Sequence, residues 1–290
     1  MKLKINFADF WPNFVATDNY FYHLLSSRYD VEISDSPDIL FYADFGSSHK
    51  ECKASQKVYY TGENKRPNFN ECDFAFSFDY SENPRNYRLP LWALWINWFG
   101  VPHCDKRDVS YLTPLSNLIG PRKASDKPKF CNFIFSNHTG LRVPLFNEIS
   151  MYSRVDSAGS LMNNMGQRIP GRGDQKPKVD FISDYRFTIA AENSSYPGYT
   201  TEKLLHPLSI GSIPIYWGSP VASLDFNSEA FINVHDFDDL EEVVDLIEEI
   251  EHDEGLYRKY VTAPVFPENK IPDLVRPESV VKFFEEKILC

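Results

Sequence analysis

The fold is decided by the stretch Arg186–Pro220, which reads RFTIAAENSSYPGYTTEKLLHPLSIGSIPIYWGSP. Its first apolar run predicts a buried strand over Phe187–Ala191. A polar loop with glycine and proline follows, and then a helix is expected over Thr201–Ile210, with a second strand at Ile213–Trp217. The order strand, loop, helix and strand predicts a parallel α/β unit.

The start of the expected helix has the chemistry of an anion site. Thr200 or Thr201 caps the helix, whose first N–H groups carry a partial positive charge that suits a phosphate. Lys203 in the first turn adds a full positive charge, and Glu202 can accept hydrogen bonds from a ribose diol. A capped helix start with an acidic first turn is also common without any ligand, so the helix pattern alone leaves both interpretations open.

Similar alternation of strands and helices extends outward in both directions. The other expected strands are Lys2–Phe7, Ile39–Ala43, Lys57–Tyr60, Phe74–Phe78 and Lys129–Phe135. The other expected helices are Asn19–Arg28, Val143–Ser153, Leu240–Ile250 and one from Pro277 through Phe284. Aromatic residues also recur at helical spacing and predict a packed helix face, namely Trp92, Trp95 and Phe99.

A polar, proline-containing segment between Pro102 and Pro128 interrupts the pattern and is interpreted as a linker. We therefore expect α/β domains at residues 1–127 and 128–266, and a C-terminal helical segment at 267–290 that packs back on the N-terminal domain. Open α/β sheets bind ligands beyond the carboxyl ends of their strands, which suggests a ligand cleft between the two domains.

Composition excludes several classes of protein. The net charge of −11 disfavours nucleic acid as a partner. The N-terminus lacks the apolar run of a signal peptide, and no apolar stretch is long enough to span a bilayer. The expected location is therefore cytoplasmic, with at most peripheral association with the inner face of a membrane. The five cysteines are scattered and favour neither a disulfide framework nor a zinc site: Cys52, Cys72, Cys104, Cys131 and Cys290.

The stretch from Glu192 to Pro220 resembles the signature of the α1,3-fucosyltransferase family, which uses GDP-fucose. Three weaker matches occur in family order. Tyr60–Phe69 (YTGENKRPNF) resembles the acceptor-side motif, Phe133–Asn137 followed by Arg142 resembles the opening of the donor domain, and Ser157–Gly166 resembles a glycine- and asparagine-rich segment of that domain.

Several positions depart from the family pattern without removing a charged group. Thr200 stands where valine is usual, Ala190 and Ala191 replace a Cys-Phe-like pair, and Ala158 replaces a glycine. The chemistry that the motif implies is therefore retained.

The resemblance implies a GT-B fold, in which two Rossmann-like α/β/α domains face each other across a cleft. The N-terminal domain would bind an oligosaccharide acceptor and the C-terminal domain GDP-fucose, with inversion in a single displacement. Glu63 would be the general base, and no metal would be required. The donor would be bound by residues that share the second half of the chain: Arg142, Asn193, Tyr199, Glu202 and Lys203.

The acceptor hydroxyl implied by the family is the 3-OH of N-acetylglucosamine in a Galβ1,4GlcNAc unit, with 1,4 transfer as the other possibility. Two alternatives to fucosyl transfer stay open. One is a transferase of the same fold that uses another GDP- or UDP-sugar, and the other is an inactive carbohydrate-binding module. Retention of both the expected base and the expected phosphate-binding cations argues against the second.

Overall fold

The computed structural model describes residues 2–100, 112–169 and 176–290. Cys104 and part of the expected linker lie outside these residues. Two compact units divide the chain. The first contains residues 2–94, 98–100 and 272–290, and the second contains residues 95–97, 112–169 and 176–271.

The first unit is built on a six-stranded sheet in the order β2-β1-β3-β4-β5-β6, with all pairs parallel. Its strands are β1 (Lys2–Ala8), β2 (Asp30–Ile33), β3 (Ile39–Tyr42), β4 (Gln56–Tyr60), β5 (Phe74–Ser77) and β6 (Asn86–Arg88). β3 is buried along its whole length, as its continuous apolar run predicts. The carboxyl ends of all six strands therefore lie at one edge of this sheet.

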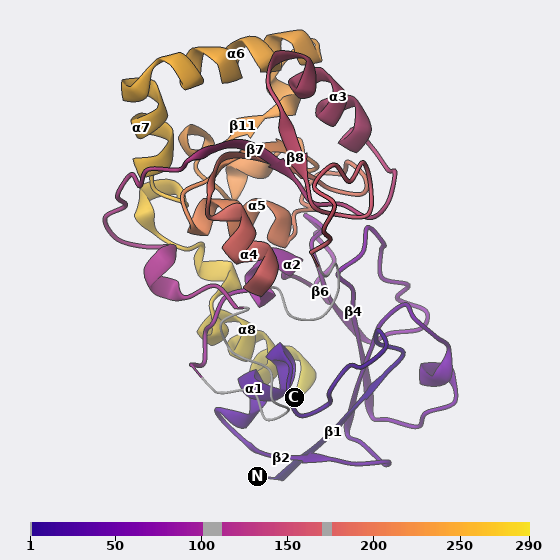
Figure 1. Cartoon of the computed structure of the whole chain (residues 1–290). Helices are drawn as coiled ribbons and strands as arrows, with labels where there is room; N and C mark the ends of the chain where they lie inside the picture. The colour runs from indigo at the N-terminus through magenta and orange to yellow at the C-terminus, as the bar shows by residue number, and fades with distance from the viewer. Residues whose placement is uncertain (1, 101–111, 170–175) are drawn as a thin grey trace. The chain divides into compact units, whose positions relative to one another are not determined.

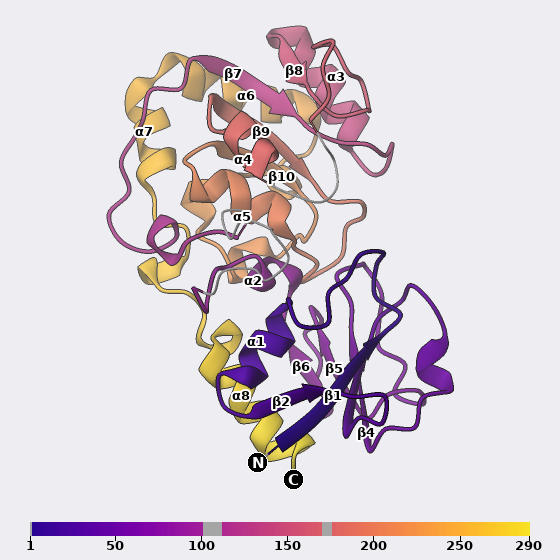
Figure 2. The same ribbon diagram turned by 60° about the horizontal axis from the view of Figure 1, so that its bottom comes forward.

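Three α-helices accompany this sheet in the described part of the chain: α1 (Tyr20–Ser26), α2 (Leu91–Leu94) and α8 (Pro277–Phe283). Helices α1 and α8 lie side by side (Figure 2). The ring of Phe21 stacks on Phe41 at 4.9 Å, and Phe284 stacks on Phe76 at 5.1 Å. The last residues of the chain thus complete the core of the first unit.

The second unit contains a five-stranded parallel sheet in the order β11-β10-β9-β7-β8. Its strands are β7 (Lys129–Phe133), β8 (Val155–Ser157), β9 (Tyr185–Ala191), β10 (Ile213–Trp217) and β11 (Ile232–Asn233). β9 and β10 pair along their length, from Ile213 opposite Phe187 to Trp217 opposite Ala191. The motif that decides the fold therefore occupies the centre of this sheet.

Helices cover both faces of this second sheet: α3 (Arg142–Tyr152), α4 (Lys176–Ile182), α5 (Glu202–Ser209), α6 (Leu240–His252) and α7 (Glu254–Thr262). Helices α3 and α6 lie on one face, and α4 and α5 lie on the other (Figure 1). Helix α6 buries Val243, Ile247 and Ile250, the apolar positions that its sequence pattern predicts to face the core.

The strands and helices expected from periodicity are confirmed, and their ends lie within two residues of the expected ones. The predicted helix face of Trp92, Trp95 and Phe99 is wrong. Helix α2 ends at Leu94, and Ile96 instead forms a parallel bridge with Thr113. Tertiary pairing therefore overrides the helical spacing of these aromatic residues. Within the described residues, no helix is both long and apolar enough to cross a membrane.

Candidate functional site

Glu192 follows β9 directly and ties the end of this strand to the start of α5. Its Oε1 accepts hydrogen bonds from the backbone N–H and the hydroxyl of Thr201, each at 2.8 Å. Its Oε2 lies 3.0 Å from Lys203 Nζ. The side chain is completely buried, so these partners take the place of the water that an ionised carboxylate would otherwise bind.

Thr201 is the cap of α5, as expected from the sequence. Its backbone is extended, and its hydroxyl accepts a hydrogen bond of 3.4 Å from the Lys203 N–H. Lys203 Nζ also donates to this hydroxyl at 3.0 Å and lies 3.6 Å from Glu202 Oε1. Burial acts to lower the pKa of Lys203, but the carboxylates of Glu192 and Glu202 outweigh it and raise this pKa.

Glu202 lies between two ammonium groups. Its Oε1 is 3.5 Å from Nζ of Lys178, which lies on α4, and 3.6 Å from Nζ of Lys203. Burial acts to raise the pKa of Glu202, but Lys203 and Lys178 lower it well below its ordinary value. Glu202 is therefore ionised at neutral pH and can accept hydrogen bonds from a ligand.

Arg142 is the first residue of α3 rather than a loop residue. Its Nε donates to the carbonyl of Ala191 at 3.2 Å, and Nη1 donates to the carbonyl of Asn137 at 3.2 Å. Its guanidinium lies 4.4 Å from the centre of the Phe135 ring. Burial lowers the pKa of this guanidinium, and Glu192 is the largest opposing influence. The structure thus brings Arg142 to the same end of β9 as the α5 residues.

The loop between β9 and α5 contains the other two expected donor residues. Tyr199 is buried, and its carbonyl accepts a hydrogen bond of 3.3 Å from the Tyr216 hydroxyl. Asn193 is partly buried, and its Oδ1 accepts a hydrogen bond of 3.0 Å from the Ser194 hydroxyl. After Glu192, Tyr199 is the next influence that opposes the lowering of the Arg142 pKa by burial.

The triplet Trp217-Gly218-Ser219, at the carboxyl end of β10, holds this loop in place. The Ser219 hydroxyl accepts a hydrogen bond of 2.9 Å from the Gly198 N–H. A Cβ atom at Gly218 would come within 2.4 Å of the Tyr216 hydroxyl oxygen and 2.5 Å of Glu192 Cγ. This position requires glycine because the backbone passes directly against the buried carboxylate.

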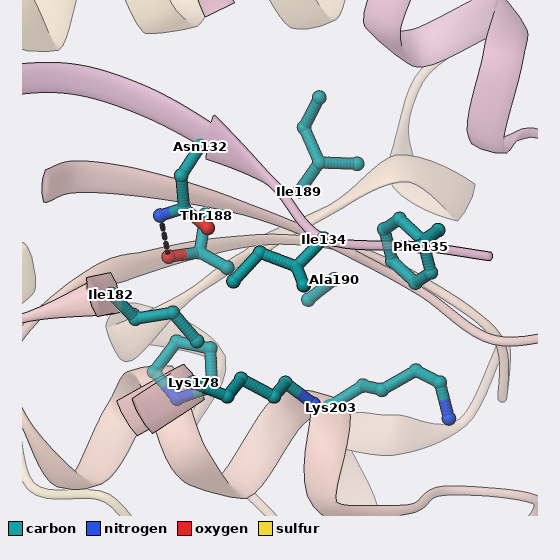
Figure 3. Close-up of a pocket in the computed structure, with 10 residues that line it drawn as sticks. Asn132, Ile134, Phe135, Lys178, Ile182, Thr188, Ile189, Ala190 and Lys203 are labelled. Atoms are coloured by element: carbon teal, nitrogen blue, oxygen red, sulfur yellow. Dashed lines mark hydrogen bonds between the residues drawn. The ribbon is translucent and has the colours of Figure 1, made fainter. Parts of the chain in front are cut away.

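A small cavity of about 30 Å³ lies between the sheet and helices α4 and α5 (Figure 3). Asn132 and Thr188 line its sheet side, where Asn132 Nδ2 donates to Thr188 Oγ1 at 2.7 Å. The side chains of Lys178 and Lys203 run along its helix side (Figure 3). Both lysines therefore reach their carboxylate partners past a buried, partly polar space.

Glu63, the expected base, lies in the first unit, three residues beyond the carboxyl end of β4. Its N–H donates to the Thr61 hydroxyl at 3.0 Å, and its carbonyl accepts from the Lys65 N–H at 2.7 Å. The side chain is partly exposed. Glu63 therefore lies in a turn beyond the carboxyl end of β4, at the kind of sheet edge where open α/β sheets bind ligands.

Three charged or titratable residues of the second unit are not predicted as site residues from the sequence. Glu192 was recognised only as part of a motif, although an acid directly after an apolar strand is a visible signal. Lys178 precedes Glu202 by 24 residues, and no spacing rule connects them. His206 is buried, and neither ring nitrogen has a hydrogen-bond partner within the described residues. Burial lowers the pKa of His206 to about 3.

Two units with parallel sheets, and charged side chains gathered at the carboxyl end of the second sheet, define the GT-B class of nucleotide-sugar transferase folds. The sequence matches family models in both units. Residues 5–95 match the alpha-(1,3)-fucosyltransferase FucT N-terminal domain, and residues 124–263 match the glycosyltransferase family 10 (fucosyltransferase) C-terminal domain. The chain belongs to glycosyltransferase family 10.

Known relatives are similar over most of the chain. Alpha-(1,3)-fucosyltransferase FucT of Helicobacter pylori is 30% identical over 285 residues, which cover 88% of this chain and 58% of the relative. This chain thus spans little more than half of that protein's length. A solved structure of an α1,3-fucosyltransferase aligns with a TM-score of 0.78 at 27% identity, covering 100% of this chain and 90% of the other. A solved structure of an α1,3-fucosyltransferase with GDP aligns with a TM-score of 0.76 at 28% identity, covering 100% of this chain and 91% of the other.

Proposed function

We propose that this protein transfers L-fucose from GDP-fucose to a hydroxyl group of an oligosaccharide acceptor. The observation that carries the proposal is the cluster at the start of α5, where three cationic side chains and two carboxylates gather around the N-terminus of a helix. Its members are Arg142, Lys178, Lys203, Glu192 and Glu202. The cluster has one positive charge in excess, which suits a diphosphate in an otherwise acidic protein.

The donor is assigned by similarity. A solved α1,3-fucosyltransferase with GDP-fucose aligns with this chain at a TM-score of 0.75 and 26% identity, covering 98% of this chain and 89% of the other. Lys203 and Arg142 are assigned to the diphosphate, and Glu202 is assigned to the ribose. Asn193 and Tyr199 border the same loop and complete the proposed donor site.

The proposed reaction is a single displacement with inversion. Glu63 accepts the proton of the acceptor hydroxyl, and the hydroxyl oxygen forms a bond to the anomeric carbon of fucose. The bond between that carbon and the β-phosphate oxygen breaks, and GDP leaves with its electron pair. Arg142, Lys203 and the first N–H groups of α5 stabilise the charge that develops on GDP, so we propose that no metal ion is needed.

The proposed acceptor is a Galβ1,4GlcNAc-type oligosaccharide, with transfer to the 3-hydroxyl of N-acetylglucosamine. Nucleic acid is not a proposed partner, because the net charge of −11 opposes binding to phosphate backbones. A cytoplasmic location, with at most peripheral attachment to the inner face of a membrane, likewise stays a proposal. Fractionation of cells that express the chain would test it.

The experiment that tests the function is turnover with a panel of nucleotide sugars and N-acetyllactosamine as the acceptor. We expect product with GDP-fucose and little with GDP-mannose, UDP-galactose or UDP-N-acetylglucosamine, with an α1,3 linkage by NMR. The rate should persist in excess EDTA. Turnover with a UDP-sugar alone would support the alternative transferase, and loss of activity in EDTA that Mn²⁺ restores would show that a metal takes part.

A further inference from the structure

Four charged side chains of the second unit form a row in which positive and negative charges alternate. Lys178 Nζ lies 3.5 Å from Glu202 Oε1, this oxygen lies 3.6 Å from Lys203 Nζ, and Lys203 Nζ lies 3.0 Å from Glu192 Oε2. The two inner residues are Glu202, which is assigned to the ribose, and Lys203, which is assigned to the diphosphate. Of the outer residues, Lys178 is a counter-ion of Glu202 and Glu192 is a counter-ion of Lys203.

Lys178, at one end of this row of charges, is largely buried. Its side chain is 17% exposed, and it lies on α4, a different helix from its partner Glu202. Lys178 lines the cavity together with Ile182 and Pro207, and its side chain extends toward Lys203 (Figure 3). An ion pair shielded in this way is weakened less by water and salt than one on the surface.

The geometry also separates two tasks. Lys203 has two carboxylates within 3.6 Å, whereas the ion pair of Lys178 within the described residues is with Glu202. Lys203 is the partner of both Glu192 and Glu202, and a bound diphosphate would draw its ammonium group away from Glu202. Lys178 reaches the same oxygen from the α4 side and can keep Glu202 oriented while Lys203 binds phosphate.

We propose that Lys178 is a positioning residue for the donor, which holds the Glu202 carboxylate in place for the ribose hydroxyls. This inference rests on the proposed function, in which Glu202 binds the ribose. Lys178 acts through Glu202 and does not itself contact the reacting atoms. A lysine that merely joins α4 to α5 would affect stability but would not distinguish between ligands that differ only in the ribose.

The test is calorimetric titration of GDP and of 2′,3′-dideoxy-GDP, which lacks the ribose hydroxyls, into Lys178→Met. Methionine retains an unbranched apolar side chain against Ile182 while removing the charge. GDP affinity should fall about tenfold, as expected when a hydrogen bond to a charged group is weakened, and affinity for the dideoxy nucleotide should be unchanged. Steady-state kinetics should show a higher KM for GDP-fucose with kcat nearly unchanged.

Lys178→Arg keeps the positive charge and should retain most of the GDP affinity, and it also serves if the methionine variant fails to fold. Lys176→Met is the matched control on the same helix. Its ammonium pairs with Asp180 at 2.6 Å, and its side chain is 47% exposed. This control should bind both nucleotides as the parent chain does.

Glu202→Gln separates failure of the inference from failure of the proposed function. This variant should also lose affinity for GDP but not for the dideoxy nucleotide. If it does so and Lys178→Met binds both nucleotides normally, or weakens both equally, only the inference is overturned. If Glu202→Gln does not distinguish the two nucleotides, the ribose assignment is wrong and the role of Lys178 falls with it.

Discussion

Glu63 and Glu192 both follow the carboxyl end of a strand in a parallel sheet, but they are built into the protein differently. Glu63 lies in a turn of the first unit, is partly exposed, and is held through its backbone by Thr61. Glu192 lies in the second unit, is completely buried, and has both oxygens bonded to Thr201 or Lys203.

The difference teaches which carboxylate can act on a substrate and which acts on its own chain. The edge of a parallel sheet provides access to a ligand in both units. A general base must reach the proton that it removes, and the partial exposure of Glu63 allows this. Glu192 is completely buried, so this carboxylate fixes the start of α5 instead.

The largest expected effect is that of Glu63→Gln on turnover. Glutamine keeps the shape of the side chain but cannot accept the acceptor proton, so kcat should fall by about 10²–10⁴. GDP affinity and the unfolding midpoint should stay near those of the parent chain, because Glu63 belongs to the other unit. Steady-state kinetics with GDP titration would check this. Near-normal turnover would mean that another group is the base, with Asp73, Asp79 and Glu82 the next candidates.

Glu192→Gln tests the buried carboxylate of this comparison, and we expect it to lower the stability of the fold. Removing one partner of a buried ion pair leaves Lys203 without its nearest counter-ion, and the free energy of unfolding should fall by about 3 kcal/mol. Urea denaturation measures it. Asp184→Asn is the control, because its pair with Lys129 is exposed and should contribute less than about 1 kcal/mol. Equal losses in both variants would show that the burial of Glu192 has no special effect.

The two cations proposed to bind the diphosphate should have a large effect on catalysis. Lys203→Ala should lower kcat/KM by about 10²–10³, which is typical of losing one group that stabilises the transition state. Arg142→Lys should also be impaired, because an ammonium cannot reproduce the two directed bonds to Ala191 and Asn137. Initial rates at low donor concentration measure both. Unchanged kinetics in Lys203→Ala would show that Lys203 belongs only to the start of the helix and does not bind the diphosphate.

Much of the fold can be predicted from the sequence, because the apolar residues of its central strands and helices follow clear strand or helix patterns. The β9, α5 and β10 segments carry apolar runs and a threonine cap, and the structure has them where they are expected. Four strands were not predicted, because they are short and lie at the ends of their sheets, where charged residues are tolerated: β2, β6, β8 and β11. A short element leaves too few residues for a period to be recognised.

The site was only partly predictable. The capping pattern of a helix start and the family motif together predict Glu202 and Lys203 as site residues. The structure brings Arg142 to the same carboxyl end of β9. The roles of Glu192 and Lys178 depend on burial and on contacts between separate elements, which a single sequence does not display. Periodicity also cannot show that a buried residue such as His206 lacks a hydrogen-bond partner within the described residues.

The last expected effect is a dependence of stability on pH, and it comes from the buried residue His206. Burial lowers its pKa from 6.5 to about 3, so between these pH values the unfolded chain binds one more proton than the folded chain. Stability should therefore fall as the pH drops below about 6.5, with His206 contributing up to about 1.4 kcal/mol per pH unit. Urea denaturation of His206→Leu should show a shallower fall between pH 6.5 and 4. A slope that His206→Leu does not alter would contradict the burial argument.

The central claim is that the charged start of α5 holds a guanosine diphosphate sugar. Calorimetric titration of GDP and UDP into the parent chain, with EDTA present, tests it most directly. The account predicts one GDP site per chain, displaced by GDP-fucose, lost in the Arg142→Ala, Lys203→Ala double variant, and at least about tenfold tighter for GDP than for UDP. Equal binding of UDP, or GDP binding that survives the double variant, would contradict it.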